Sequence, residues 1–214
     1  LYAYEAPVFV SDSVRETLRS IGASGSDSEM LEWAAGQHPV LAKMIPAMTM
    51  MTVTPTGLGT SEPANVVPPV VELTCDCRTL PEQGEADIRA HIEAAIGSGI
   101  EWEMELLEPL EGGFESPTDT ALFRICQQFL YERLPGAVLM PMITAGFTDS
   151  HWVRQAGGTT AYGFAPVFDT GVDEYLRSMH GADEKLRVSD LEAMAEFHLF
   201  ALRRRLQDCC GTVP

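Results

Sequence analysis

The chain has 214 residues and a formal net charge of −17, because 31 Asp and Glu residues outnumber 14 Lys and Arg residues. Hydrophobic residues make up 45% and charged residues 21% of the sequence, a globular composition that excludes wholesale disorder and collagen-like repeats. An acidic surface of this size repels phosphate backbones, so the composition disfavours a nucleic-acid partner.

No run of about 18 apolar residues occurs, so we expect no membrane-spanning helix and no membrane partner. The sequence does not open on a charged segment followed by an apolar one, and we therefore expect no signal peptide. The five cysteines follow no regular spacing, which favours free thiols and a cytoplasmic protein. The chain begins at Leu1 rather than Met, and residues 2–7 read as the middle of a polypeptide, so we expect a fragment or a processed chain.

The first 50 residues predict short helices. Apolar residues recur at three- or four-residue spacing across 13–21, and Ser11 or Asp12 can cap the start of that helix. A loop rich in Gly and Ser follows over 22–28. Two more helices are expected over 29–35 and 39–48.

The middle of the chain predicts paired strands and one helix. Residues 51–56 are rich in β-branched side chains, 70–79 alternate between apolar and polar, 84–97 have helical periodicity, and 101–107 alternate again. This order is most of a ferredoxin-like split βαβ module that lacks its first strand and helix. The face of 70–79 that we expect to be buried carries Val71, Leu73, Cys75 and Cys77.

The last hundred residues predict an α/β arrangement. A helix is expected over 118–134, and the continuous apolar run 137–143 predicts a strand of a parallel sheet that is covered on both faces. Residues 158–164 predict a second strand, and a final helix over 189–206 is expected to be capped by Ser189. Its inward face is expected to carry Val188, Leu191, Met194, Ala195, His198, Leu199 and Leu202.

Two groups of polar residues suggest substrate binding. Asn65 and Arg78, expected to converge from adjacent strands, would form a clamp for a carboxylate or an amide carbonyl; the alternative is a turn Asn and a surface Arg. Gly146, Thr148 and Ser150 follow the apolar run 137–143, at the carboxyl end of a predicted strand where open α/β sheets bind ligands. The alternative for this second group is an ordinary loop and helix cap, with Asp149 as the capping residue.

A third group contains His180, which precedes Gly181 and lies near Asp183 and Glu184. Neutral imidazole is a preferred zinc ligand, and nearby carboxylates can orient it or complete a site. The alternative is a lone surface or core histidine, since the other histidines show no metal-ligand spacing.

Together these stretches resemble the aminoacylase, carboxypeptidase G, acetylornithine deacetylase and succinyl-diaminopimelate desuccinylase family of di-zinc hydrolases, in its carboxypeptidase-S-like branch. The resemblance covers about residues 50–206, and residues 1–50 match more weakly. The stretches that carry it are Thr52-Val-Thr-Pro-Thr, Asn65-Val-Val-Pro, Leu73 to Pro81, Gly146-Phe-Thr-Asp-Ser, Ala161-Tyr-Gly-Phe with Pro166, and Met179-His-Gly-Ala-Asp-Glu.

The resemblance implies an α/β fold class: part of a zinc-exopeptidase catalytic α/β domain plus a ferredoxin-like α+β lid used for dimerisation, both incomplete. It implies that residues 1–50 are a helical insert of the lid and that 51–108 are the later part of the lid. Residues 109–208 would be the C-terminal part of the catalytic domain, and 209–214 a tail.

The resemblance also implies a function, the metal-dependent hydrolysis of amide bonds in peptides or N-acyl amino acids by an exopeptidase or deacylase. Two zinc ions would share a water molecule, and a Glu would act as general base. By resemblance His180 is the last metal ligand. The substrate-binding residues that it implies are Asn65, Arg78, Gly146, Thr148 and Ser150.

The departures from the family limit what this chain can do alone. The family's other metal ligands, its general base, and the first strand and helix of its lid lie upstream of the matched region, and His151 stands where Arg is common. We therefore expect the isolated chain to be inactive, and we expect a homodimer through the lid or association with the missing N-terminal half. The alternatives are a non-catalytic dimerisation or binding remnant of the family and an unrelated α/β binding protein.

Overall fold

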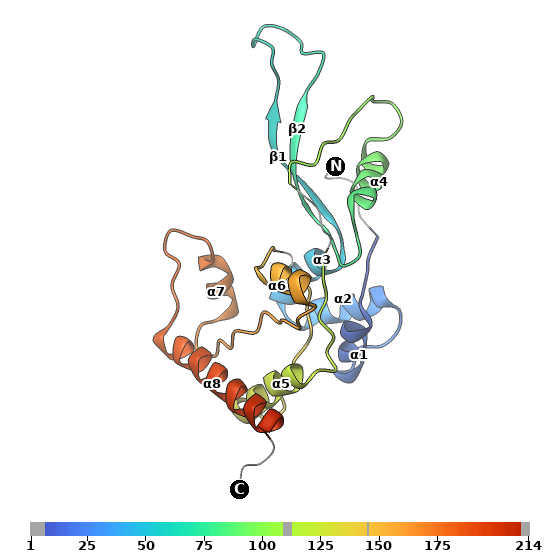
Figure 1. The fold of residues 1–214 in the computed structure, drawn as a ribbon. Coiled ribbons are helices and arrows are strands. Elements are labelled where there is room, and N and C mark those ends of the chain that lie inside the picture. The colour runs from blue at the N-terminus through green and yellow to red at the C-terminus, as the bar shows by residue number, and fades with distance from the viewer. Residues whose placement is uncertain (1–6, 109–112, 145, 211–214) are drawn as a thin grey trace.

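The computed structural model describes residues 7–108, 113–144 and 146–210, with side chains described as far as Gln207. Within these residues the chain forms eight helices and two strands (Figure 1). No helix of the described part combines the length and the apolar character that crossing a membrane requires. The helices are α1 (Asp12–Ser20), α2 (Asp27–Gln37), α3 (Pro39–Thr49), α4 (Glu85–Ile96), α5 (Ala121–Arg133), α6 (Ser150–Gly157), α7 (Val172–Ser178) and α8 (Val188–Cys210), and the strands are β1 (Thr52–Gly59) and β2 (Glu72–Arg78).

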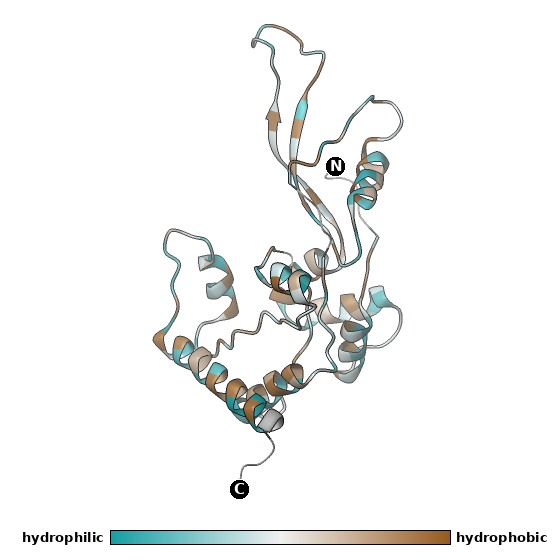
Figure 2. Ribbon diagram, viewed as in Figure 1, coloured by the Kyte–Doolittle hydropathy of each residue, from teal (hydrophilic) through white to brown (hydrophobic). Residues whose placement is uncertain are grey.

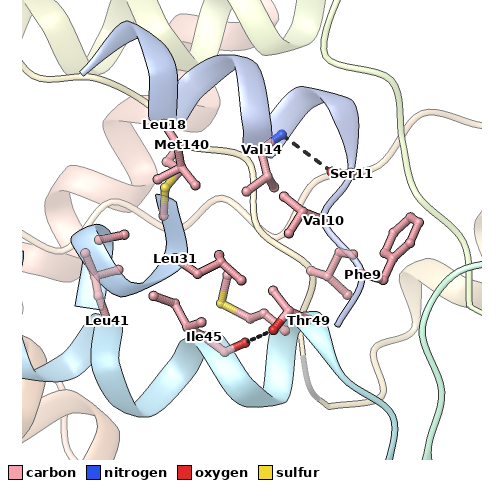
Figure 3. A pocket seen from close by; sticks show the side chains of 13 residues that line it. Phe9, Val10, Ser11, Val14, Leu18, Leu31, Leu41, Ile45, Thr49 and Met140 are labelled. Carbon is pink, nitrogen blue, oxygen red and sulfur yellow. Dashed lines mark hydrogen bonds between the residues drawn. The ribbon is translucent and has the colours of Figure 1, made fainter. Parts of the chain in front are cut away.

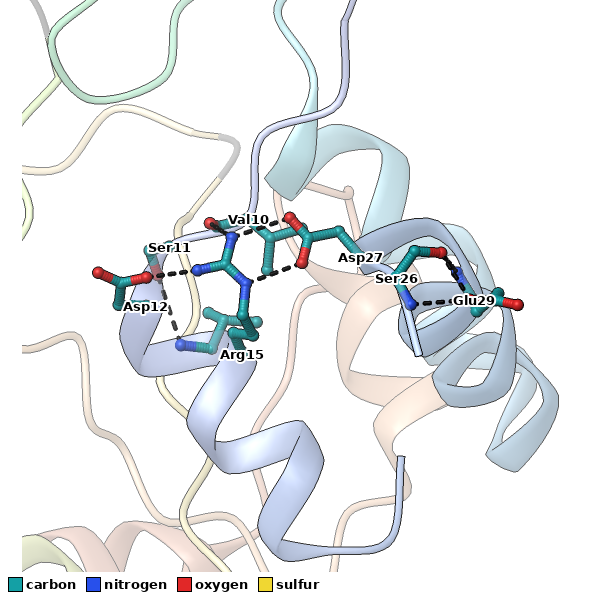
Figure 4. Close-up of polar contacts among 8 residues, drawn as sticks. Val10, Ser11, Asp12, Arg15, Ser26, Asp27 and Glu29 are labelled. Atoms are coloured by element: carbon teal, nitrogen blue, oxygen red, sulfur yellow. Dashed lines mark hydrogen bonds and ion pairs between the residues drawn. The ribbon is translucent and has the colours of Figure 1, made fainter. Parts of the chain in front are cut away.

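The three N-terminal helices confirm the expectation for this region, and local caps fix where they start. Ser11 accepts a hydrogen bond from the backbone N–H of Val14 at 3.5 Å and so caps α1. Ser26 and Glu29 form a reciprocal capping box, which starts α2 two residues before the predicted boundary (Figure 4). His38 caps α3 through its ring nitrogen Nδ1, which accepts from the N–H of Val40 at 3.2 Å.

One ion pair ties α1 to the start of α2 (Figure 4). The guanidinium of Arg15 donates two hydrogen bonds of 2.8 Å to the carboxylate of Asp27, and a third of 3.0 Å to the carbonyl oxygen of Val10. This bidentate contact lowers the pKa of Asp27 below its usual value. It fixes the angle between the two helices across the connecting loop.

The N-terminal helices also pack against the apolar segment 137–143, which was predicted as a strand of a parallel sheet. A small apolar cavity of ≈ 20 Å³ lies among α1, α2, α3 and the segment containing Met140 and Ile143 (Figure 3). A space of this size holds at most about one water molecule, so it is a packing gap rather than a ligand site. The contact joins the helical region to the C-terminal part of the chain.

The two strands form an antiparallel hairpin, which confirms the predicted strand pair. The register pairs Thr52 with Arg78 and Gly59 with Glu72, with an irregularity between Pro55 and Gly57. The expected buried face does not form, because Val71 and Leu73 are exposed and Cys75 and Cys77 are only half-buried. Figure 1 shows the hairpin projecting away from α5 and α8, so little of the described chain covers it.

Three of the predicted strands are wrong: 101–107, 137–143 and 158–164 form no β-ladder with any described segment. The alternation persists only over 101–105, since Trp102 and Met104 are half-buried and the glutamates beside them are exposed, whereas Leu106 is exposed as well. The spacing of apolar residues indicates which side chains are buried. A β-ladder requires in addition a neighbouring strand that supplies hydrogen bonds. The fold is therefore a mixed helix and sheet structure, and the expected parallel sheet does not form among its described residues.

The C-terminal core forms between α5 and α8. Phe129 of α5 meets Phe197 of α8 with ring centroids 5.3 Å apart, and Phe164 meets the same Phe197 ring at 4.6 Å. The helix α5 begins at Ala121 rather than at 118, because the side chain of Thr120 caps it by accepting from the N–H of Phe123. Half-buried residues from both predicted strands complete this core, among them Leu139, Tyr162 and Phe164.

The predicted inward face of α8 is wrong. Asp190, Ala193 and Phe197 are the buried residues of this helix, whereas Val188, Leu191, Leu199 and Leu202 are exposed. Ser189 is not the cap either, because it lies inside the first turn and the carbonyl oxygen of Arg187 accepts the first helical hydrogen bonds. Apolar residues recur on two opposite faces of α8, so periodicity alone did not select the one that meets the core.

A buried carboxylate anchors the start of α8. Asp190 is fully buried, and one of its oxygens accepts from the N–H groups of Phe168 and Asp169 at 2.7 and 2.9 Å. The other oxygen accepts from the N–H and the hydroxyl of Thr170 at 2.9 and 2.6 Å. Burial opposes ionisation of Asp190, but these hydrogen bonds outweigh it and lower its pKa to about 2. The segment before α7 is thereby fixed to the first turn of α8.

We expect Asp190→Asn to lower the melting temperature of the protein, because the amide nitrogen of Asn would face the N–H of Thr170 as a second donor. The stability difference from wild type should be full above the ordinary pKa of 3.8 and should shrink as the pH falls towards about 2, where the native carboxyl also becomes protonated. Thermal unfolding at several pH values measures this, with the exposed Asp183→Asn as control. A difference that is constant down to pH 2 would contradict the assignment.

Candidate functional site

His180 lies in a tight turn directly after α7. It is exposed and has a left-handed backbone conformation, with φ 60°, which is uncommon for a residue that carries a side chain. The turn closes with a hydrogen bond of 2.9 Å from the N–H of Gly181 to the carbonyl oxygen of Ser178. A Cβ at Gly181 would lie 3.1 Å from that oxygen, a tight contact, so the turn favours a glycine there. The fold thus presents the His180 imidazole at the surface and not within a core.

Both ends of the loop that carries His180 are held. Its N-terminal side follows Thr170, which Asp190 binds, and its C-terminal side is tied to α7 through Glu174. The carboxylate of Glu174 meets Lys185 at 3.7 Å and Arg187 at 3.5 Å. These exposed ion pairs each contribute little to stability, but together with the buried carboxylate they restrict where the loop can lie.

The described residues contain no group of three or more His, Cys, Asp or Glu side chains that could hold a metal ion. The polar depression around α7 and this loop is open and is lined by charged residues of both signs, but His180 is not among its lining. Among the described residues, the metal prediction therefore rests on the exposed imidazole of His180 alone.

The segment 146–150 forms an exposed bend that leads into α6. Gly146 and Thr148 are exposed and Ser150 is half-buried. The carbonyl oxygen of Thr148 accepts from the N–H of His151 at 3.0 Å. Asp149 occupies the cap position, but its side chain makes no capping hydrogen bond. The polar groups of this bend therefore face solvent, as a binding surface requires.

A hydrogen-bond network that the sequence analysis did not find holds α6 in place. The hydroxyl of Ser116 accepts from Nε of Arg154 at 3.0 Å and from the N–H of Ala161 at 3.1 Å, and it donates to the Ala161 carbonyl oxygen at 3.0 Å. Arg154 donates to the same carbonyl oxygen. Ser116 thus joins the segment before α5, the helix α6 and the predicted strand 158–164. No local pattern signals it, because its partners lie 38 and 45 residues away.

Aromatic rings surround His151 at the start of α6. Its ring centroid lies 4.8 Å from that of Trp152, 5.2 Å from Phe114 and 5.5 Å from Phe147. The Phe114, Phe147 and Trp152 side chains are all exposed. This aromatic cluster adjoins the bend 146–150 and gives that surface an apolar component.

The structure does not bring Asn65 and Arg78 together. Asn65 is exposed in the connection between β1 and β2, beyond the end of the hairpin where Gly59 pairs with Glu72. Arg78 lies at the other end of β2, where it donates to Asp76 at 2.8 Å. Six residues of strand at about 3.3 Å each separate Glu72 from Arg78 by about 20 Å. The predicted clamp is therefore not formed within this hairpin, and the substrate role of each residue stays a prediction.

Comparison with known proteins finds a distant relative. The chain is 22% identical over 174 residues to a protein of Dictyostelium discoideum named "Probable carboxypeptidase S-like 2". The aligned region covers 78% of this chain and 33% of the relative, so the chain spans about a third of the relative's length. No protein-family model and no solved structure matches the chain. The chain is thus a distant homologue of a probable carboxypeptidase S-like protein.

We expect Ser116→Ala to cost about 1–2 kcal/mol of stability, because the N–H of Ala161 and the Arg154 guanidinium lose their shared partner. Hydrogen exchange should rise in α6 and in 158–164 more than in α1 to α3. Ser20→Ala is the matched control, since that hydroxyl makes a single exposed bond to Thr17 in its own helix. A uniform effect on all helices would count against the network's local role.

Proposed function

We propose that this chain forms part of a metal-dependent hydrolase that cleaves amide bonds of peptides or N-acyl amino acids, in the manner of an exopeptidase or deacylase. The alignment with a carboxypeptidase S-like protein over 174 residues carries the proposal. The family-like stretches of the sequence around Gly146 and His180 also support it. The chain alone is proposed to be inactive, because its described residues contain no group of three side chains that could hold a metal ion.

Zinc is the proposed metal, with His180 as one ligand in a site completed by other polypeptide. The exposed imidazole and the glycine turn behind it support this role, since a ligand at an assembled site has to project from its own domain. The described residues by themselves do not fit a zinc site, because no group of three potential ligands occurs among them. We therefore assign no catalytic step to this chain's own metal ligand.

The proposed substrate contacts come from two regions. Arg78 offers paired donors that suit a carboxylate terminus, and Asp76 holds its guanidinium at an exposed end of β2. Gly146, Thr148 and Ser150 offer small side chains and hydroxyls on the bend before α6. Since the structure keeps Asn65 about one strand length from Arg78, Asn65 is proposed to act on substrate bound by a different part of the assembly.

The proposed partners are a second copy through the hairpin, or the polypeptide that completes the catalytic domain. Each strand of the two-stranded sheet has one edge that pairs with no other described strand, and open edges can add a strand from another chain. A cytoplasmic location is proposed with these partners, and the free thiols of Cys75, Cys77 and Cys126 are compatible with it.

We expect His180→Ala in the assembled enzyme to lower bound zinc and to reduce amide hydrolysis by at least about 100-fold, since even outer-shell changes cost about 10- to 100-fold. The measurements are metal content and hydrolysis of an N-acyl amino acid. His38→Ser is the control, because serine removes an imidazole but keeps a cap for α3. Unchanged zinc content in His180→Ala would refute the ligand assignment.

We expect Arg78→Lys to raise KM by about tenfold or more while changing kcat less, because the lysine loses the paired donors that bind a carboxylate. Arg89→Lys, on α4, is the matched control, since the side chains of Arg78 and Arg89 are both 42% exposed and both ion-paired. Steady-state kinetics with substrates that carry a free or an amidated carboxyl terminus test this. Equal KM values for wild type and Arg78→Lys would remove Arg78 from the substrate site.

A second candidate function is a non-catalytic binding or dimerisation module. The lack of a three-ligand group among the described residues favours it over an enzyme that works alone. Such a module purifies without stoichiometric zinc and still dimerises through the hairpin, whereas the hydrolase portion gains zinc when the rest of the catalytic domain is supplied.

A further inference from the structure

The aromatic cluster at the start of α6 gathers exposed rings at one place on the described surface. Phe114, Phe147 and Trp152 are 44%, 58% and 53% exposed, although each of these rings contacts His151. Exposed apolar residues are ordinary where they are scattered singly, whereas a contiguous group marks an interaction site. Figure 2 shows hydrophobic and hydrophilic residues side by side on α6. The cluster therefore has the character of a binding surface rather than of a packed core.

The rings of the cluster are held by one another and by the backbone. Phe147 and Trp152 meet edge to face, with centroids 5.9 Å apart and an interplanar angle of 64°. Phe114 comes from the segment before α5, and it is held beside α6 because Ser116, two residues later, accepts a hydrogen bond of 3.0 Å from Arg154. Rings that are already ordered lose little side-chain entropy when a ligand covers them, so such rings suit a binding site.

The polar groups beside the cluster indicate which kind of molecule fits this surface. Gly146, Thr148 and Ser150 lie on the same bend as Phe147, and they offer hydroxyls and a backbone that is uncrowded at the glycine. Small-molecule sites are mostly apolar and carry a few polar groups that fix the orientation of the ligand. A molecule in which an amide or a carboxylate is joined to a large apolar group matches both parts of the surface.

The charges near the cluster disfavour an acidic group on the rings. Glu115 and Asp149 are exposed carboxylates that adjoin ring-bearing residues in the chain. Arg154, the arginine of α6, already donates to the hydroxyl of Ser116 and to the carbonyl oxygen of Ala161. An acidic group placed on the rings would thus meet like charges, while the arginine of the helix is engaged elsewhere. A neutral group pays no such penalty.

We propose that the aromatic cluster is a subsite for a neutral aromatic side chain of an N-acyl amino acid or peptide, whose polar end lies on the bend 146–150. The inference rests on the proposed function and names the class of substrate that this site takes. A ring is favoured over an alkyl chain because the rings of the cluster offer it further edge-to-face contacts. Phe114, Phe147 and Trp152 are then specificity-determining residues.

The test follows Trp152 by fluorine NMR in the 214-residue chain labelled with fluorotryptophan. The chain has three tryptophans, so Trp33 and Trp102 are internal controls, and Trp33→Phe and Trp102→Phe assign the resonances. N-acetylphenylalanine should shift the Trp152 resonance to saturation and leave the other two unchanged. N-acetylalanine and N-acetylaspartate should bind at least about tenfold more weakly, because they bring no ring to the cluster.

Variants of the cluster should lose this binding. Phe147→Ala should bind N-acetylphenylalanine about tenfold more weakly than wild type. Tyr131→Ala, on α5, is the matched control, because Tyr131 is also 58% exposed and lies outside the cluster. Melting temperature and circular dichroism should be unchanged in both variants, since both rings are exposed. Phe114→Ala removes a ring from a different segment and should weaken binding in the same way.

The proposal is overturned if N-acetylphenylalanine does not move the Trp152 resonance, moves all three resonances alike, or binds no better than N-acetylaspartate. It is also overturned if the Trp152 resonance moves with protein concentration alone and ultracentrifugation shows a dimer, because a second copy then covers the cluster. Binding supports the inference whether or not an amide is hydrolysed. Failure of the proposed function, which zinc content and hydrolysis measure, is therefore distinguishable from failure of this subsite.

Discussion

The buried carboxylate of Asp190 is the interaction on which the C-terminal half of this molecule depends. Its oxygens accept hydrogen bonds from the backbone N–H groups of Phe168, Asp169 and Thr170. These bonds fix the segment before α7 to the first turn of α8. With its pKa lowered to about 2, the group stays ionised at any physiological pH, and the clamp does not titrate during function. This contact holds the N-terminal end of the segment that carries α7 and His180 against α8.

Elements that are determined within a few residues were predicted well from the sequence. The cap at Ser11 and the hairpin strands act locally, so a short window contains their cause. The capping box of Ser26 and Glu29 is also local, but it was not predicted, and it starts α2 at Asp27 rather than at 29. The strands at 137–143 and 158–164 failed for the opposite reason. Their apolar character is real and they contact the core, but a ladder is a property of two segments, and the second is not found among the described residues.

The candidate site shows the same division between local and distant causes. His180 was singled out from its neighbours in sequence, yet its left-handed backbone and its exposure emerge only from the turn that Gly181 allows. Ser116 was missed because its partners in α6 and in 158–164 are far away in the chain. Convergence of Asn65 with Arg78 was expected from adjacent strands, but the register places them at opposite ends of the hairpin.

These mismatches have one physical origin. The features to which the sequence analysis assigned a function all lie on exposed parts of the described chain. They are the His180 turn, the bend 146–150 and the open edges of the hairpin. The inner faces of α5, α8 and the N-terminal helices are packed well enough to define a fold, with aromatic contacts near 5 Å and a bidentate ion pair. This distribution supports the proposal of a hydrolase whose ligands are divided between two polypeptide regions, since each region would then have a stable core of its own and exposed residues where the regions meet.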